Sequence, residues 1–122
     1  MPTRSLITPP NTDAAHKAAV IRQLNDGFRR SFTRGNLLLT PAVDGLDTGS
    51  KAALLTAVQQ FDRFNTDNDP YGEHDFGAID LGAACYLWKI DYYDPDLQFG
   101  SADPADEAVT CRVMTIMRAD EY

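Results

Sequence analysis

The strand expected at residues 84–92 constrains the fold more than any other stretch of the chain. Tyr86, Trp88, Ile90 and Tyr92 recur at every second position, and Trp88 is the only tryptophan among the 122 residues. Because successive side chains of a β-strand point to opposite faces, these four side chains share one face of a sheet. A face of this kind must be covered by other elements, so the pattern predicts a sheet packed beneath helices.

The other expected elements follow from apolar spacing and from capping residues. Helices are expected over residues 11–34 and from about 47–50 to 64, and strands over 36–40, 75–81, 84–92 and 109–119. The last strand is apolar on both faces, which is typical of a central strand. The order α-β-α-β-β-β predicts an α+β fold, with two helices packed on one face of a mostly antiparallel four-stranded sheet. We expect residues 1–10 to form a flexible leader and residues 11–122 to form a single domain.

Charge is distributed unevenly along the chain, whose formal net charge is −7. Residues 1–35 contain six basic and two acidic residues, whereas residues 36–122 contain five basic and sixteen acidic ones. Arg29, Arg30 and Arg34 lie near the C-terminal end of the first helix, off its apolar stripe. There they can stabilise the helix dipole or, together with Arg22, contact nucleic acid, and both interpretations remain open.

Six short motifs together resemble one family. They are L-N-D-x-F-R-R at Leu24–Arg30, F-D-x-F at Phe61–Phe64, N-D-P-Y-G-E-H-D-F-G at Asn68–Gly77, W-K-I-D-Y-Y-D at Trp88–Asp94, G-S-x-D-P-A-D at Gly100–Asp106 and R-V-M-T-I-M at Arg112–Met117. The combination is similar to a small bacterial family known only as domain of unknown function 3768, over about residues 20–122. Members of that family resemble accessory genes of plasmids and other mobile elements. The resemblance therefore implies a role in evading host defence.

The segment Glu73-His74-Asp75 is the best candidate for enzymatic chemistry. Together with Asp91 and Asp94 it supplies the histidine and carboxylate groups that a metal-dependent hydrolase or ligand-binding domain uses. A structural role for His74, hydrogen-bonded to a carboxylate or to the backbone, explains the same residues. The sequence contains no P-loop, no G-x-G-x-x-G and no H-E-x-x-H motif. We therefore predict no cofactor and no metal, and we favour a protein that is not an enzyme.

Acidic residues in predicted loops are the best candidates for partner binding. They are Asp67, Asp69, Glu73, Asp75, Asp94, Asp96, Asp103, Asp106 and Glu107. Spaced carboxylates can imitate the phosphate charges of a nucleic acid and block a basic groove. We expect the chain to bind and inhibit a basic nucleic-acid-handling protein of the host, as anti-CRISPR and antirestriction proteins do, without contacting nucleic acid itself.

The sequence shows no apolar signal core and no apolar run of about 20 residues, the length that a membrane span needs. Its two cysteines form no C-x-x-C pair. A cytoplasmic protein that makes no membrane contact is expected, either as a monomer or as a homodimer joined through free sheet edges.

Overall fold

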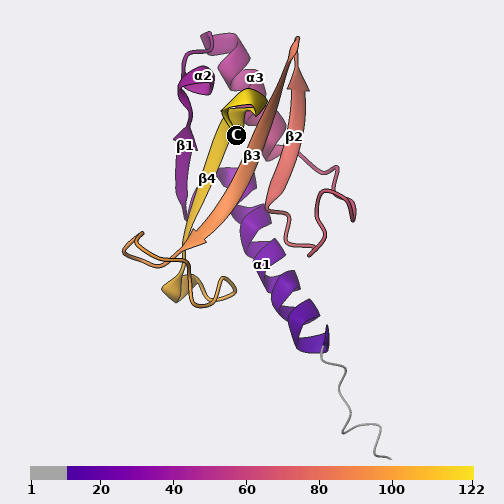
Figure 1. Ribbon diagram of the computed structural model, residues 1–122, viewed down its shortest axis with the longest axis vertical. Coiled ribbons are helices and arrows are strands. Elements are labelled where there is room, and N and C mark those ends of the chain that lie inside the picture. The colour runs from indigo at the N-terminus through magenta and orange to yellow at the C-terminus, as the bar shows by residue number, and fades with distance from the viewer. Residues whose placement is uncertain (1–10) are drawn as a thin grey trace, which may run out of the picture.

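The protein is represented by a computed structural model that describes residues 11–122 (Figure 1). The leader expected at residues 1–10 lies outside the described residues. The helices are α1 (Asn11–Ser31), α2 (Pro41–Asp44) and α3 (Thr48–Gln59), with short 3₁₀ turns η2 (Glu107–Val109) and η3 (Ala119–Glu121). The strands are β1 (Asn36–Leu39), β2 (Phe76–Leu81), β3 (Ala84–Tyr93) and β4 (Cys111–Arg118). No helix among the described residues combines the length and the apolar character needed to cross a bilayer.

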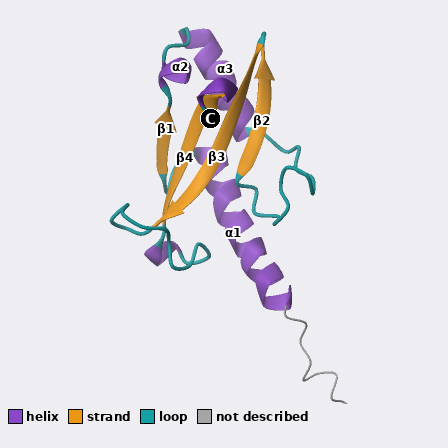
Figure 2. Ribbon diagram, viewed as in Figure 1, coloured by secondary structure: helices purple, strands orange, loops and turns teal. Residues whose placement is uncertain are grey.

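The four strands form one sheet in the order β1-β4-β3-β2. The β2–β3 and β3–β4 pairs are antiparallel, and the β1–β4 pair is parallel. In the view of Figure 2, α1 and α3 lie behind the sheet, so the face toward the viewer is free of long helices. The predicted α+β fold, with helices on one face of a mostly antiparallel four-stranded sheet, is therefore confirmed.

The helix-covered face of β3 carries the aromatic row that the alternation predicted. Tyr86, Trp88 and Ile90 are buried beneath the helices, and Trp88 has no exposed surface. The ring of Phe61, which follows α3, meets the Trp88 indole edge to face at 5.5 Å between centroids. Gly82 adopts φ 63°, a conformation that glycine tolerates without strain, and this closes the tight β2–β3 turn.

Helix α1 ends earlier than the sequence predicts. Gly35 was the expected stop, but the helix ends at Ser31 because Phe32 takes a left-handed backbone conformation with φ 56°. The Phe32 amide donates to the Phe28 carbonyl at 2.7 Å, which satisfies one of the last helical acceptors. Gly35 has a packing role instead, since a Cβ at this position would lie 2.5 Å from the Phe28 ring.

The other boundaries also shift. Helix α3 begins where expected, with Asp47 accepting from the Ser50 amide at 2.8 Å, but it ends at Gln59 rather than near residue 64. The residues beyond Gln59 leave the helix so that Phe61 can enter the core. Strand β4 runs only from Cys111 to Arg118, because Val109 ends the turn η2 and Ala119 begins the turn η3. Its predicted central position in the sheet is confirmed.

Candidate functional site

Eight of the nine candidate acids lie on two loops that adjoin the open end of the β2–β3 hairpin, and Glu107 is the first residue of η2. The first, residues 60–75, joins α3 to β2 and lies at the right of the sheet in Figure 1. The second, residues 94–106, joins β3 to η2 and lies at the lower left. The structure therefore separates the acids into two groups rather than gathering them at one place.

In the first loop, two of the four candidate acids are used inside the fold. The Asp69 carboxylate is buried and accepts from the backbone amides of Glu73 and His74 at 3.0 and 3.1 Å. The Glu73 carboxylate accepts from the Tyr92 hydroxyl at 2.7 Å. Asp67 is exposed. The first loop consequently offers a partner much less negative charge than its sequence suggests.

His74 fastens this loop to α1. Its Nδ1 lies 2.8 Å from the Asp26 carboxylate, and its Nε2 lies 3.6 Å from the Asp69 carboxylate. The imidazole stacks on the Phe64 ring, with 3.7 Å between centroids and an interplanar angle of 4°. Because both ring nitrogens face carboxylates of the protein itself, the geometry favours the structural role for His74 over that of a ligand or a general base.

Four of the five residues of the hypothetical hydrolase site already have partners elsewhere in the fold. Asp91 pairs with Lys89 at 2.8 Å, and Asp94 accepts from the Gln98 amide at 3.0 Å. Within residues 11–122, no group of three or more His, Cys, Asp or Glu side chains is arranged to hold a metal ion. The arrangement gives no support to metal-dependent chemistry in this region.

Asn25 is the centre of a buried polar network that the sequence did not reveal. Its Nδ2 donates to the Tyr92 hydroxyl at 2.8 Å and to the Glu73 carbonyl at 3.0 Å. Its Oδ1 accepts from the Arg112 Nε at 2.7 Å, and the Arg112 guanidinium also lies over the Tyr92 ring. Burial and the hydrogen bond to Glu73 raise the pKa of Tyr92 far above its ordinary value, so the hydroxyl remains a donor. An asparagine in the interior of a helix, where its propensity is poor, was the available signal.

Arg29 belongs to the core and not to an exposed basic cluster. Only 1% of its surface is accessible, and its guanidinium donates to Asp26 at 2.9 Å and to the Phe61 carbonyl at 3.1 Å. It also lies 5.3 and 5.4 Å from the centroids of the Phe64 and Trp88 rings. The hypothesis that placed Arg29 with Arg22, Arg30 and Arg34 in a nucleic-acid contact is therefore wrong for this residue.

The pKa values of Asp26 and Asp75 are shifted in opposite directions. Burial alone would raise the pKa of Asp26, but hydrogen bonds from Arg29 and His74 outweigh it and hold the pKa below its ordinary value. The stabilisation from Asp26 is therefore present above the ordinary pKa and is lost as the pH falls through the lowered one. Burial, followed by repulsion from Glu73, raises the pKa of Asp75, so ionised Asp75 disfavours the folded state at neutral pH.

We therefore expect Asp75→Asn to stabilise the protein at pH 7, by up to about 0.5 kcal/mol. The gain should vanish as the pH falls below the ordinary pKa of an aspartate, where wild-type Asp75 is neutral in both folded and unfolded states. Urea titrations at pH 7 and pH 3 measure this difference. Asp62→Asn, at an exposed position on the same loop, is the matched control. Equal effects of the two substitutions at both pH values would contradict the prediction.

The second loop presents apolar side chains to solvent from a fixed backbone. Phe99 is 71% exposed and Leu97 is 51% exposed. The Asp94 amide donates to the Phe99 carbonyl at 2.8 Å, and the Leu97 amide donates to the Asp94 carbonyl at 3.0 Å. Leu97 holds φ 60°, which is unfavourable for a leucine by about 1–2 kcal/mol. Neither residue was expected to be exposed, and the available signal was their place between Asp96 and Asp103 in a predicted loop.

Several carboxylates surround these apolar residues or follow them in the chain. Asp96 is exposed, and Asp106 caps η2 by accepting from the Ala108 amide at 2.9 Å. Asp103 lies 3.9 Å from Lys17, and Glu107 lies 3.8 Å from Arg34, both in exposed ion pairs of a kind that contributes little to stability. These carboxylates remain accessible to a partner, so the second loop is the stronger candidate site.

A comparison of the chain with known protein families finds a match. The model of a family described as "Protein of unknown function (DUF3768)" matches residues 39–121, which span the described fold from the end of β1 to η3. The chain belongs to the DUF3768 family. The matched residues include both loops that contain the candidate acids, 60–75 and 94–106, but they do not include α1. No curated protein and no solved structure shows a significant match to the chain.

Proposed function

We propose that this DUF3768 protein is a binding protein that inhibits a basic, nucleic-acid-handling protein of its host. The contact surface is the acidic loop, defined here as residues 94–107. The exposure of Leu97 and Phe99 on a hydrogen-bonded loop carries the proposal. Leu97 and Phe99 would be buried against the partner, and the neighbouring carboxylates would favour a partner with a basic surface.

The energetics of association support this division of roles. Burying a side chain the size of phenylalanine or leucine contributes about 1.5–3 kcal/mol, so two such anchors can supply much of the affinity. The backbone of the loop is already fixed by its hydrogen bonds, so little conformational entropy is lost on binding. The carboxylates steer a basic partner and oppose acidic ones, which affects the association rate and specificity more than the affinity.

The proposed contact surface contains fewer acidic residues than the sequence suggested. Asp94, Asp96, Asp103, Asp106 and Glu107 belong to the acidic loop, where most of the carboxylates remain accessible. Asp69 and Glu73 are engaged in the fold, so they are left out of the proposed contact. Neutralising accessible acids should weaken binding most at low ionic strength, since salt screens charges about 10 Å apart at 0.1 M.

We expect Phe99→Ala to reduce capture of the partner at least tenfold, the effect of losing about 1.4 kcal/mol or more at an interface. The measurement is quantitative capture on immobilised protein from a lysate of the native host, followed by identification of the retained protein. Leu97→Gly should also weaken capture while it relieves the left-handed backbone, so lower stability cannot explain its loss of binding. Asp96→Lys tests the contribution of charge.

Tyr71→Ala is the matched control, because Tyr71 is 79% exposed on the other loop. It should leave capture unchanged. The proposal requires that the retained protein handle nucleic acid and that its activity fall when the wild-type chain is added. Capture that is equal for wild type and Phe99→Ala, or a retained protein whose activity does not change, would overturn it.

A further inference from the structure

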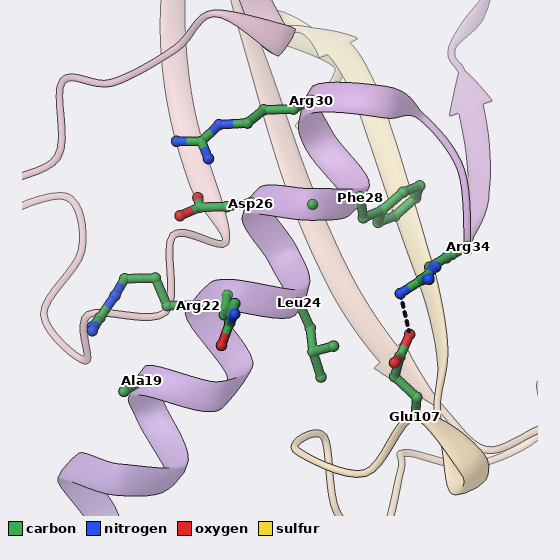
Figure 3. Close-up of a pocket in the computed structure, with 10 residues that line it drawn as sticks. Ala19, Arg22, Leu24, Asp26, Phe28, Arg30, Arg34 and Glu107 are labelled. Carbon is green, nitrogen blue, oxygen red and sulfur yellow. Dashed lines mark ion pairs between the residues drawn. The ribbon is translucent and has the colours of Figure 1, made fainter.

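The exposed side of α1 forms a shallow trough whose charge is opposite to that of the acidic loop. Figure 3 shows its walls: Arg22, Asp26 and Arg30 project to one side of the helix, and Leu24, Phe28, Arg34 and Glu107 lie on the other. Gln23 and Gly27 also line it, between the two walls. Apart from Glu107, which also belongs to the acidic loop, the proposed function makes no use of this surface.

The trough is locally basic although the whole chain is acidic. Its lining includes three arginines and two carboxylates, and the charge of Asp26 is already balanced by the buried Arg29. Arg30 is exposed and makes no hydrogen bond or ion pair with any part of the chain between residues 11 and 122. At physiological salt, charges beyond about 8 Å are largely screened, so a ligand in the trough responds mainly to these arginines.

One carboxylate already occupies an edge of the trough. Glu107 lies 3.8 Å from the Arg34 guanidinium, drawn as the dashed line in Figure 3. Arg34 is held at φ 70°, an unfavourable conformation for a residue with a Cβ. This backbone brings the Arg34 side chain next to the helix that ended three residues earlier. The pair shows that a carboxylate can approach the trough and also that it is weakly held, because both side chains are exposed.

Gly27 leaves the floor of the trough open. A Cβ built at this position meets no atom within 4 Å. Glycine in the middle of a helix destabilises it relative to alanine, and the space around Gly27 would admit a side chain. The absence of a side chain lets another backbone come close to α1, as small residues do where two helices cross. Leu24 adds a partly buried apolar contact at the edge.

We infer that this trough binds an acidic amphipathic helix of another protein. Glutamates one turn apart on such a helix lie about 6 Å apart along its axis, the same separation as successive residues at spacing four on α1. Single-stranded nucleic acid is less suited to the surface, because it binds through exposed aromatic faces and Phe28, the trough's aromatic residue, is only 1% exposed.

The test uses a fluorescein-labelled helical peptide of about five turns. Leucine and alanine form one stripe of this helix, and glutamates lie along the edges of the stripe, one turn apart. Fluorescence anisotropy should show binding to the full chain, and the double substitution Arg30→Gln and Arg34→Gln should weaken it about tenfold or more. Arg118→Gln, in an exposed ion pair with Asp120 away from α1, should have no effect. Glu107→Gln should strengthen binding, since it removes the carboxylate that competes for Arg34.

Gly27→Leu separates binding from folding. Leucine favours a helix more than glycine does and would also fill the floor of the trough, so peptide binding should be lost while the melting temperature rises. Failure of the peptide to bind wild type, or unchanged binding to Gly27→Leu, would overturn the inference. So would equal binding of a peptide with lysine in place of glutamate, or tighter binding of labelled oligothymidine. None of these outcomes affects the test on Phe99, because that test concerns another loop and a basic partner.

Discussion

Replacing Arg29 by methionine is expected to destabilise the protein by about 3–5 kcal/mol, the range for removing one partner of a buried ion pair. The substitution keeps most of the apolar volume but removes the donors to Asp26 and to the Phe61 carbonyl. The Asp26 carboxylate would then keep only His74 as a partner, and the Phe61 carbonyl would lose this donor in the interior. Stacking of the guanidinium beside Trp88 would also be lost.

Urea unfolding at pH 7, followed by circular dichroism, measures this effect. Arg30→Met is the matched control, since Arg30 is the next residue in the helix and is exposed. Its effect should stay within about 0.5 kcal/mol, as for other surface positions. The assignment of Arg29 to the core would be contradicted if the two substitutions destabilised the protein equally.

Gly77→Ala is the second substitution with a large expected effect. Gly77 is paired with Trp88 across the hairpin, and a Cβ there would lie 2.8 Å from the Phe61 ring and in collision with the Trp88 indole. Alanine in a strand is otherwise favoured over glycine by about 0.5–1 kcal/mol. Because both neighbours are buried rings of the core, we expect the clash to reverse that sign and to destabilise the protein by about 2–3 kcal/mol.

The intrinsic fluorescence of Trp88 reports on this substitution directly, since the chain has no other tryptophan. A changed emission maximum in the folded state would show that the indole has moved, and denaturant unfolding gives the loss of stability. Gly49→Ala is the control: its Cβ would meet only the Asp47 carboxylate, at 3.5 Å. That substitution lies in α3 and should be neutral or mildly stabilising. Matching losses at Gly49 and Gly77 would argue against the close packing described here.

The two loops that contain the candidate acids show where residue-by-residue interpretation of the sequence fails. Nine carboxylates looked equivalent because each stood in a predicted loop. In the structure Asp69 is buried and caps backbone amides, whereas Asp96 is exposed. Loop carboxylates commonly cap nearby amides, and whether one does so depends on local backbone geometry that composition does not encode. The same geometry exposes Leu97 and Phe99, residues that hydrophobicity alone would place inside.

The sequence by itself determined the layers of this protein. Alternation along β3, spacing of four along α1 and glycine at the hairpin turn are local signals, and each arises from the geometry of a single element. They were sufficient for the two long helices, the four strands, the buried aromatic face and the central position of β4, but not for the short helix α2. Helix ends were less certain, because α1 stops at a left-handed phenylalanine that no local rule favours.

Only the tertiary structure decided which polar residues lie inside. Asn25 and Arg112 are 87 positions apart and hydrogen-bond in the interior, and Asp26 meets His74 across 48 positions. A buried polar group is stable only when its partners are present, and those partners come from elements that fold together from distant parts of the chain. Periodicity shows which face of an element is apolar. Periodicity does not show which arginine will be buried in an ion pair with a carboxylate.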